Sequence, residues 1–367
     1  MHWGDYRHDP VRSTPVKNKR NPKKTCSSSN LCSSSATGLP VKKKIPVDRL
    51  PLVKVQRETI AAVEGGGYHL ATGEGVKLDE FRLQRGVHLT QLHRDAYSLH
   101  VHSPRVPTLP VIAGAVKSDT PVKSGGDAPA EVFVVNGDSF DVAKALQDCG
   151  FRPAVMNMAN ENHPGGGYKR GARAQEEDLH RRSNLFSHLD NPDSVPRAKP
   201  WSYPIPELGV VYSPDVCVFR DIAARGYAWL HHPFSVDVVS VAAYKNPCLT
   251  PVGQLAPDVA KRTVLKIKGA LMAAVYHGND AVVLGALGCG AFHNPPRHVA
   301  ALFQRVLAEV LPMYPQLRVV TFAILEDANS VKNRAGGNIA PFTATFHGKG
   351  PALSVKELIT ELRVGIR

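Results

Sequence analysis

The chain has 367 residues, of which 43% are hydrophobic, so it is long enough to bury a substantial core in one large domain with additions or in two domains. No stretch approaches the roughly 18 uninterrupted apolar residues of a membrane-spanning helix. The first residues also lack the basic-then-apolar order of a secretory signal. We therefore expect an intracellular protein without membrane contact, in either the cytoplasm or the nucleus.

The net charge of +13 is concentrated near the N-terminus. Residues 1–57 hold 13 of the 45 Lys and Arg but only 3 of the 32 Asp and Glu, which leaves 32 basic and 29 acidic residues in the rest of the chain. A basic segment attracts nucleic acid or another polyanion through a weak, salt-dependent contact. We expect any such contact to come from this segment, although a solvated leader without a partner is the simpler alternative.

The first 128 residues are predicted to contain two regions. Residues 1–50 combine clusters of Lys and Arg with runs of serine and hold too little apolar material to offset the entropy of ordering, so we expect a disordered leader. Residues 51–128 are expected to form an accessory segment. Its predicted parts are a helix over 53–63, short strands over 65–70 and 75–78, and a linker rich in Pro, Gly and Ser over 103–129.

Residues 129–367 alternate apolar strands with helices, which predicts an α/β domain. The predicted strands cover residues 131–135, 153–157, 210–212, 216–219, 236–243, 281–284 and 318–325. The predicted helices run through 142–146 and over 172–189, 259–276 and 295–311. The expected fold is a three-layer α/β structure, in which a mixed sheet is flanked by helices and a small N-terminal accessory segment is added.

The spacing of cysteine and histidine does not favour a metal site. The six cysteines are scattered and form no Cys-x-x-Cys pair, which structural zinc sites commonly use. The adjacent His231 and His232 lack carboxylate or thiol companions nearby in the sequence. We therefore expect reduced cysteines and no bound metal.

The segment from Asn160 to Glu177 carries the strongest chemical signal. Gly165, Gly166 and Gly167 follow a predicted strand and allow the backbone to approach a ligand where any Cβ would clash. Asn160, at the end of that strand, offers an amide to ligand hydroxyls. Ligands of open α/β sheets bind at the C-terminal ends of the strands, so this position favours a binding site.

Gln175, Glu176 and Glu177 lie in the first turns of the next predicted helix. Adjacent helical residues diverge by roughly 100°, so the two glutamates are not expected to flank one bond as the paired carboxylates of sugar hydrolases do. We expect one to hold a sugar and the other to act at the scissile bond. A helix N-terminus lowers the pKa of a carboxyl group, whereas a general acid needs a raised pKa, so proton donation must depend on burial or on the charge of the ligand.

A second glycine-rich loop follows the strand predicted at 281–284. It consists of Gly288, Cys289, Gly290, Ala291 and Phe292. Backbone N–H groups of such a loop before a helix suit phosphate oxygens. Asn294 is predicted to cap the following helix and Pro295 to occupy its first position. The order matches neither the Rossmann dinucleotide fingerprint nor a P-loop, and we expect no cofactor.

The spacing of three glycines, seven residues and then Gln-Glu-Glu resembles the catalytic signature of poly(ADP-ribose) glycohydrolases. The longer string from Asn160 to Ser183 is similar to the microbial-type branch of that family. Three other strings support the branch, at Asn136–Ser139, Tyr212–Arg220 and Gly288–Phe292. The resemblance extends from about Val53 to the C-terminus.

This resemblance implies a macrodomain fold that binds ADP-ribose at the strand ends without a metal. Glu177 would be the catalytic carboxylate, which protonates the leaving hydroxyl and then activates water, and Glu176 would hold ribose hydroxyls. The three glycines would approach the diphosphate and the reacting ribose. The other implied substrate-binding residues are Asn160 at the distal ribose, Gln175, the loop Gly288–Phe292 at the diphosphate, and, by analogy with macrodomains generally, Asp138 at the adenine amine.

The implied activity is cleavage of ribose–ribose bonds in poly(ADP-ribose) by a monomer. His180 and His293 depart from the pattern of the family, but neither stands at a catalytic position. Three alternatives stay open. The chain could remove single ADP-ribose groups from protein or nucleic acid, it could bind ADP-ribose without cleaving it, or, on charge alone, it could be a nucleic-acid-binding module.

Overall fold

The central sheet has the strand order β3–β6–β7–β5–β8–β9–β4. The computed structural model describes residues 45–99, 130–190, 201–326, 337–348 and 350–365. The strands of this sheet are β3 (Gln91–His93), β4 (Glu131–Val135), β5 (Pro153–Ala159), β6 (Val210–Arg220), β7 (Trp229–Ala242), β8 (Ala281–Leu284) and β9 (Val319–Ala323). β7, β5, β8, β9 and β4 run parallel, whereas β6 and β3 are antiparallel to their neighbours. The mixed sheet predicted from the sequence is confirmed.

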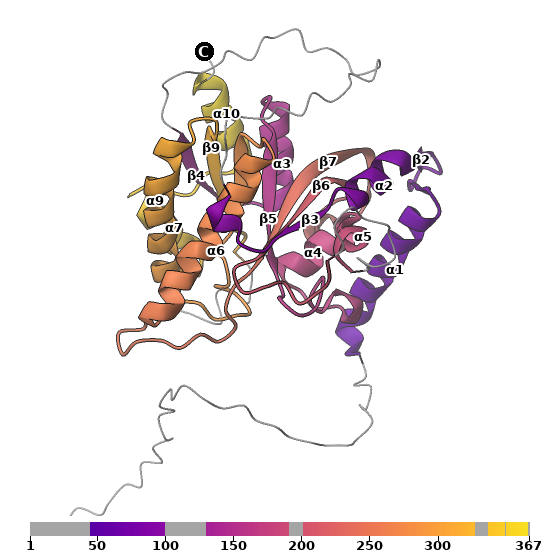
Figure 1. Cartoon of the computed structure of the whole chain (residues 1–367). Helices are drawn as coiled ribbons and strands as arrows, with labels where there is room; N and C mark the ends of the chain where they lie inside the picture. Colours follow the sequence, from indigo (N-terminus) through magenta and orange to yellow (C-terminus); the bar gives the residue numbers. More distant parts are fainter. Residues whose placement is uncertain (1–44, 100–129, 191–200, 327–336, 349, 366–367) are drawn as a thin grey trace, which may run out of the picture. The chain divides into compact units, whose positions relative to one another are not determined.

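Helices cover both faces of this sheet (Figure 1). One face packs against α3 (Ser139–Asp148), α4 (Gln175–Arg182), α5 (Leu185–Leu189) and α10 (Val355–Gly365). The other packs against α6 (Pro257–Tyr276), α7 (Pro296–Val310) and α9 (Ile339–Phe346). Successive strand residues alternate between the two apolar clusters, as Val282 and Val283 do. The three-layer architecture is therefore confirmed.

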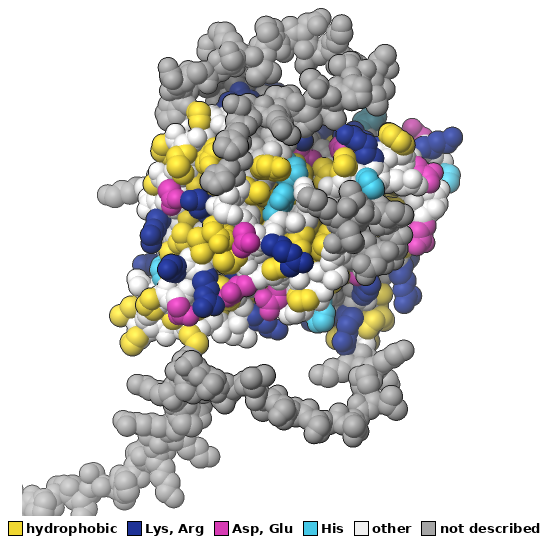
Figure 2. Space-filling view, viewed as in Figure 1, with side chains coloured by type: hydrophobic (Ala, Val, Ile, Leu, Met, Phe, Trp, Pro, Cys, Tyr) yellow, Lys and Arg dark blue, Asp and Glu magenta, His cyan; other side chains and the backbone are white. Residues whose placement is uncertain are grey.

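All the described residues belong to one compact unit. Most of the predicted leader and the predicted linker over 103–129 lie outside the described residues, and the predicted division at residues 50 and 128 stays a prediction. None of the described helices is both long and apolar enough to cross a membrane. On the face drawn in Figure 2, basic and acidic side chains are interspersed, as the small net charge beyond residue 57 leads one to expect.

The region predicted as accessory forms α1 (Leu50–Glu64), the hairpin of β1 (Gly67–His69) and β2 (Gly75–Lys77), α2 (Glu80–His88) and β3. The predicted helix and the two short strands are confirmed. This region also contributes to the main fold, because β3 pairs with β6 at the sheet edge. Tyr68 of the hairpin stacks on Trp229 of β7 with ring centroids 4.5 Å apart. Thr59 of α1 donates a hydrogen bond to the carbonyl oxygen of Arg181 at 2.7 Å, which attaches α1 to α4.

The prediction of one helix over 172–189 is wrong, because the chain leaves the helix at Ser183 and Asn184 between α4 and α5. Ser183 is extended, with φ −147° and ψ 177°, and forms an isolated bridge with Val218 of β6. The side-chain oxygen of Asn184 accepts a hydrogen bond from the Cys217 N–H at 2.7 Å. Pairing with β6 thus ends the helix, and the helical periodicity of the sequence does not indicate this pairing.

The predicted strands at 210–212 and 216–219 are a single strand, β6, with an irregularity between Ser213 and Val216. Asp215 within it has a positive φ of 54°. β7 is also longer than predicted and begins at Trp229 rather than at residue 236. Hydrogen bonds between β6 and β7 keep both strands extended at polar residues that interrupt the apolar pattern of the sequence.

The end of α4 is held by a buried arginine. Arg182 is 1% exposed, and its Nη1 lies 2.6 Å from Asp138 Oδ1 and 3.3 Å from Asp178 Oδ2. Its Nη2 lies 3.3 Å from Asp141 Oδ1, and the guanidinium lies over the ring of Phe140. Removing a buried cation from an ion cluster leaves charges without a partner, which costs more than removing an exposed partner.

We predict that Arg182→Met lowers the free energy of unfolding by roughly 3–5 kcal/mol, because Asp138 and Asp178 lose their buried cationic partner and Asp141 keeps only the exposed Arg225. Arg225→Met is the matched control. Arg225 pairs with Asp141 and Asp221, but its side chain is 54% exposed, so its loss should cost less than about 1 kcal/mol. Urea denaturation of both variants measures the difference, and equal losses would contradict the assignment.

The largely buried side chain of His277 makes the stability of the protein depend on pH. His277 stacks on Tyr212 with ring centroids 3.7 Å apart, and its Nε2 lies 2.9 Å from Nε2 of His93. Burial, and to a smaller extent the charges of His93 and Arg152, lower the pKa of His277 to about 3. Its pKa in the unfolded chain is about 6.5, so the unfolded state binds a proton first as the pH falls.

We predict that His277 reduces stability as the pH falls below 6.5. Between pH 7 and pH 5 its contribution should lower the free energy of unfolding by about 2 kcal/mol. The His277→Gln variant should lack this part of the pH dependence, whatever its stability at pH 7. Denaturant unfolding of both proteins at the two pH values gives the comparison, and parallel losses would show that His277 is protonated in the folded protein.

Candidate active site

A glycine loop folds back from the end of β5 onto the N-terminus of α4. Gly165 and Gly166 have φ values of 69° and 55°, in the left-handed region that favours glycine. The Gly165 N–H donates to Oε1 of Glu176 at 3.1 Å, and the Gly167 N–H donates to Oε1 of Glu177 at 2.8 Å. The loop and the two carboxylates predicted from the sequence therefore form one hydrogen-bonded cluster.

The other oxygens of the two carboxylates also accept backbone hydrogen bonds. Oε2 of Glu176 accepts from the Asn160 N–H at 2.8 Å, and Oε2 of Glu177 accepts from the Ala174 N–H at 2.9 Å. The second contact is the capping interaction at the start of α4. Every carboxylate oxygen of the pair is thus held by main chain, which positions both groups firmly.

Gly166 lies between the two carboxylates. A Cβ on Gly166 would be 2.7 Å from Oε1 of Glu177 and 3.1 Å from Oε2 of Glu176. Both glutamates therefore reach the same turn of the loop, although they are adjacent in the helix. The prediction that they have different roles is compatible with this arrangement and stays a prediction.

Both carboxylates are shielded from water. Glu176 is 4% exposed and Glu177 is 7% exposed. Burial raises the pKa of Glu176 well above its ordinary value, and the charge of Glu177 adds to this effect, whereas the N–H donors of Asn160 and Gly165 oppose it. At Glu176, desolvation therefore outweighs the lowering of the pKa that the helix N-terminus led us to expect.

Gln175 attaches α4 to the sheet. Its side-chain oxygen accepts from the Met158 N–H at 2.9 Å, and its nitrogen donates to the Met156 carbonyl at 2.7 Å and to Ser139 Oγ at 3.2 Å. These bonds hold the first residue of α4 against β5. Gln175 is a positioning residue in this structure, and a direct contact with substrate stays a prediction.

The side chain of Asn160 also shapes its own loop. Its Oδ1 accepts from the N–H groups of Asn162 and His163 at 2.9 and 3.0 Å. Asn157, three residues earlier in β5, is fully buried, and its side-chain nitrogen donates to Ser240 Oγ at 3.0 Å. Asn160 is therefore at the predicted place, at the end of β5, whereas Asn157 lies inside the sheet.

The second glycine loop follows β8, which pairs in parallel with β5, so both loops lie at the same edge of the sheet. Gly288 has φ 72°, and a Cβ there would be 2.5 Å from Nδ2 of Asn294. Nothing lies within 4 Å of a Cβ placed on Gly290, which leaves space beside its backbone. Cys289 is buried, Ala291 is exposed, and Phe292 packs partly against the core.

The prediction that Asn294 caps α7 is wrong. α7 begins at Pro296 with Pro295 in the capping position, and no side chain caps it. Nδ2 of Asn294 instead donates to the carbonyl oxygens of Tyr244 at 2.7 Å and Gly288 at 3.1 Å. Asn294 therefore holds the second loop closed and attaches it to the segment after β7.

Asp138 lies at the start of α3, after β4. Its Oδ1 accepts from the Phe140 and Asp141 N–H groups and pairs with Arg182. The structure thus gives this carboxylate a role in capping α3 and in charge compensation. The adenine contact suggested for Asp138 stays a prediction.

Sequence patterns did not indicate the segment Trp201–Gly209, which we call the 201–209 strap. The Ile205 N–H donates to the carbonyl oxygen of Glu161 at 2.8 Å, so the strap lies against the first glycine loop. The available signal is its composition, in which Trp201 and Tyr203 are followed by Pro204 and Pro206. His180, which departs from the pattern of the family, lies beneath the loop, where its Cδ2 would be 2.7 Å from a Cβ on Gly165.

His180 is neutral in this position. Its Nδ1 lies 2.8 Å from the carbonyl oxygen of Glu176, and its ring packs against Tyr168 with centroids 5.0 Å apart. Complete burial lowers its pKa to about 4. It supports the loop from within the core.

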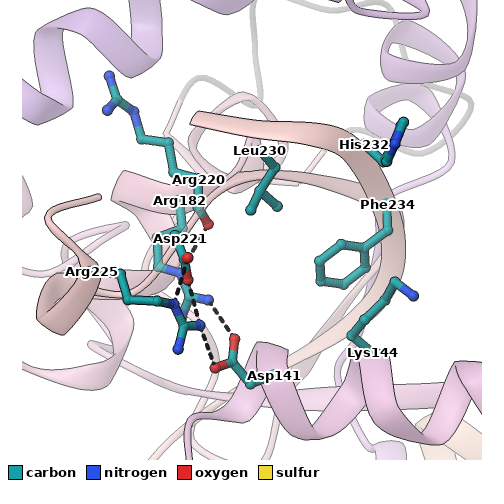
Figure 3. A pocket seen from close by; sticks show the side chains of 9 residues that line it. All are labelled: Asp141, Lys144, Arg182, Arg220, Asp221, Arg225, Leu230, His232 and Phe234. Atoms are coloured by element: carbon teal, nitrogen blue, oxygen red, sulfur yellow. Dashed lines mark hydrogen bonds and ion pairs between the residues drawn. The ribbon is translucent and has the colours of Figure 1, made fainter. Parts of the chain in front are cut away.

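A separate pocket of about 270 Å³ lies between α3 and the β6–β7 pair (Figure 3). It contains none of the predicted site residues. Figure 3 shows Arg225 bonded to Asp141 and Asp221 on one side of the pocket, whereas Lys144, His232 and Phe234 lie on the other side. Each of its Lys and Arg side chains pairs with a carboxylate, as Lys144 does with Asp148 and Arg220 with Glu58, so we assign it no catalytic role. Among the described residues no cluster of three or more His, Cys, Asp or Glu could hold a metal ion.

Comparison with known proteins gives a consistent result. Residues 56–221 match the family model of the microbial-type PARG, catalytic domain, where PARG denotes poly(ADP-ribose) glycohydrolase. The structure is similar to that of poly(ADP-ribose) glycohydrolase from Thermomonospora curvata, with a TM-score of 0.63 and 25% identity over 80% of this chain and 99% of that one. It is also similar to the Deinococcus radiodurans enzyme in complex with ADP-ribose, with a TM-score of 0.54 and 25% identity over 75% of this chain and 100% of that one. No curated protein matches.

Proposed function

We propose, from the premise that this chain carries a microbial-type PARG catalytic domain, that it hydrolyses the ribose–ribose bonds of poly(ADP-ribose) and releases ADP-ribose. One observation carries the proposal. The glycine loop holds two buried carboxylates at the strand ends, where ligands of α/β sheets bind. Relatives with the same fold include an enzyme bound to ADP-ribose.

Glu177 is the proposed catalytic residue. Its carboxyl group gives a proton to the ribose oxygen that leaves, and the C–O bond at the anomeric carbon breaks. It then takes a proton from the water that attacks that carbon, so the group returns to its starting state. The bonds from Gly167 and Ala174 hold the side chain in place during both steps.

Glu176 is proposed to bind ribose hydroxyls. Hydroxyl groups both donate and accept hydrogen bonds, so a carboxyl group with a raised pKa can hold them in either protonation state. The diphosphate is proposed to lie along the second loop, where the open side of Gly290 leaves room for phosphate oxygens near the backbone. Phe292 borders this region.

Removal of single ADP-ribose groups is the second candidate function, because it would use the same carboxylate with a different leaving group. A reader that binds without cleaving is less favoured, since binding alone does not require the fixed geometry of Glu177. Parallel assays on polymer and on mono-modified protein separate these functions. The monomeric state and any polyanion contact of the leader stay predictions.

We predict that Glu177→Gln lowers the release of ADP-ribose from polymer by at least about 100-fold, because the amide cannot transfer the proton. Binding of ADP-ribose, measured by calorimetry, should change little. Glu309→Gln, an exposed carboxylate on α7, is the control and should keep full activity. Wild-type turnover by the Glu177 variant would remove this residue from the mechanism.

We predict that Gly166→Ala lowers activity more than tenfold, because the new Cβ meets both carboxylates. Gly226→Ala is a matched control. Gly226 also has a positive φ, of 70°, but nothing lies within 4 Å of a Cβ there. The two variants share the backbone strain, so comparable stability with a loss of activity confined to Gly166→Ala would isolate the steric effect on the carboxylates. Equal activity in both would contradict it.

A further inference from the structure

The 201–209 strap is fixed at two places beside the proposed site. Near its middle, the Ile205 N–H donates to the carbonyl oxygen of Glu161, the residue after Asn160. Near its end, Glu207 Oε1 accepts from the hydroxyl of Tyr244 at 2.7 Å and from Nη1 of Arg262 at 2.8 Å. The strap is therefore attached both to the catalytic glycine loop and to the residues that follow β7 and begin α6.

Tyr203 is the residue of this strap whose polar group is unexplained. Its ring lies near that of Trp201, with centroids 5.7 Å apart, and packs against the apolar cluster on the face of the sheet that α3, α4, α5 and α10 cover. Its hydroxyl oxygen is buried and has no hydrogen-bond partner among the described residues. A buried hydroxyl without a partner costs roughly 1–3 kcal/mol, a cost that phenylalanine at this position would avoid.

The surroundings of the hydroxyl keep it protonated. Burial raises the pKa of Tyr203 well above its ordinary value, and the negative charges of Glu176 and then Asp190 raise it further. Asp190 already accepts a hydrogen bond from the Tyr168 hydroxyl at 2.7 Å and pairs with Lys169. Glu176, whose oxygens are each held by one N–H, is the neighbour that the proposed function brings into contact with substrate.

We propose that Tyr203 is a further substrate-binding residue, whose hydroxyl forms a hydrogen bond with a ribose hydroxyl of the ADP-ribose unit held by Glu176. This assignment rests on the proposed function. The ribose carries two adjacent hydroxyls, so one can form a hydrogen bond with Glu176 while the other forms a hydrogen bond with the Tyr203 hydroxyl. The ligand then supplies the partner that the tyrosine lacks in the free protein.

The test is the Tyr203→Phe variant, which removes the hydroxyl and keeps the ring. Loss of one hydrogen bond to bound ribose should raise the Kd for ADP-ribose and the KM for polymer about fivefold to tenfold. The value of kcat should change less. The thermal midpoint should stay the same or rise, because the variant loses an unpaired buried hydroxyl.

Tyr227→Phe is the matched control. The Tyr227 hydroxyl donates to Asp178 Oδ1 at 2.7 Å, so its loss should lower stability and leave Kd and KM unchanged. The two variants are thus expected to show opposite patterns. If Tyr203→Phe behaves like Tyr227→Phe, or leaves Kd and KM unchanged, Tyr203 has a structural role only and the proposal is overturned.

The outcome for the wild type separates the two proposals. A wild-type protein that cleaves polymer, together with an unaltered Tyr203→Phe variant, rejects the assignment of Tyr203 and keeps the proposed function. A wild-type protein that neither binds ADP-ribose nor cleaves polymer rejects the function, and the assignment of Tyr203 with it.

Discussion

The closure of the glycine loop on two glutamate carboxylates is the interaction on which the rest of the site depends. Main-chain N–H groups from Asn160, Gly165, Gly167 and Ala174 each bond one carboxylate oxygen. This arrangement requires a residue without a Cβ at Gly166 and a helix that begins at a fixed distance from β5. It gives two acidic groups a defined position in a place from which water is largely excluded.

The position of α4 is determined by contacts along its whole length. Gln175 holds its start against β5, Thr59 of α1 bonds the carbonyl oxygen of Arg181, and the buried Arg182 joins its end to aspartates of α3 and α4. The N-terminal region therefore supports the helix that carries both glutamates, in addition to completing the sheet with β3. Changes in α1 should reach the site through this contact.

Burial of ionisable groups connects the site to the stability of the fold. The raised pKa of Glu176 and the lowered pKa of His180 both follow from desolvation, one beside the loop and one beneath it. Their effects on stability have opposite signs as the pH falls, because folding favours the protonated form of Glu176 and the neutral form of His180. Burial of these ionisable groups lowers the free energy of unfolding, and it also fixes their hydrogen bonds in a place from which water is largely excluded.

The sequence alone determined the features that depend on local pattern. The alternation of apolar strands and helices predicted the three-layer architecture. The order of glycines and glutamates predicted that the glycine loop and the start of α4 lie together at the end of β5. Only the tertiary structure decided the contacts between distant residues. The break between α4 and α5 comes from pairing with β6, and Asn294 bonds the carbonyl oxygen of Tyr244 instead of capping α7. Burial overrides the helix N-terminus at Glu176, and the 201–209 strap reaches the first glycine loop from another segment through the bond from Ile205 to Glu161. Desolvation and long-range hydrogen bonds depend on which segments pack together, and the local order of residues does not contain that information.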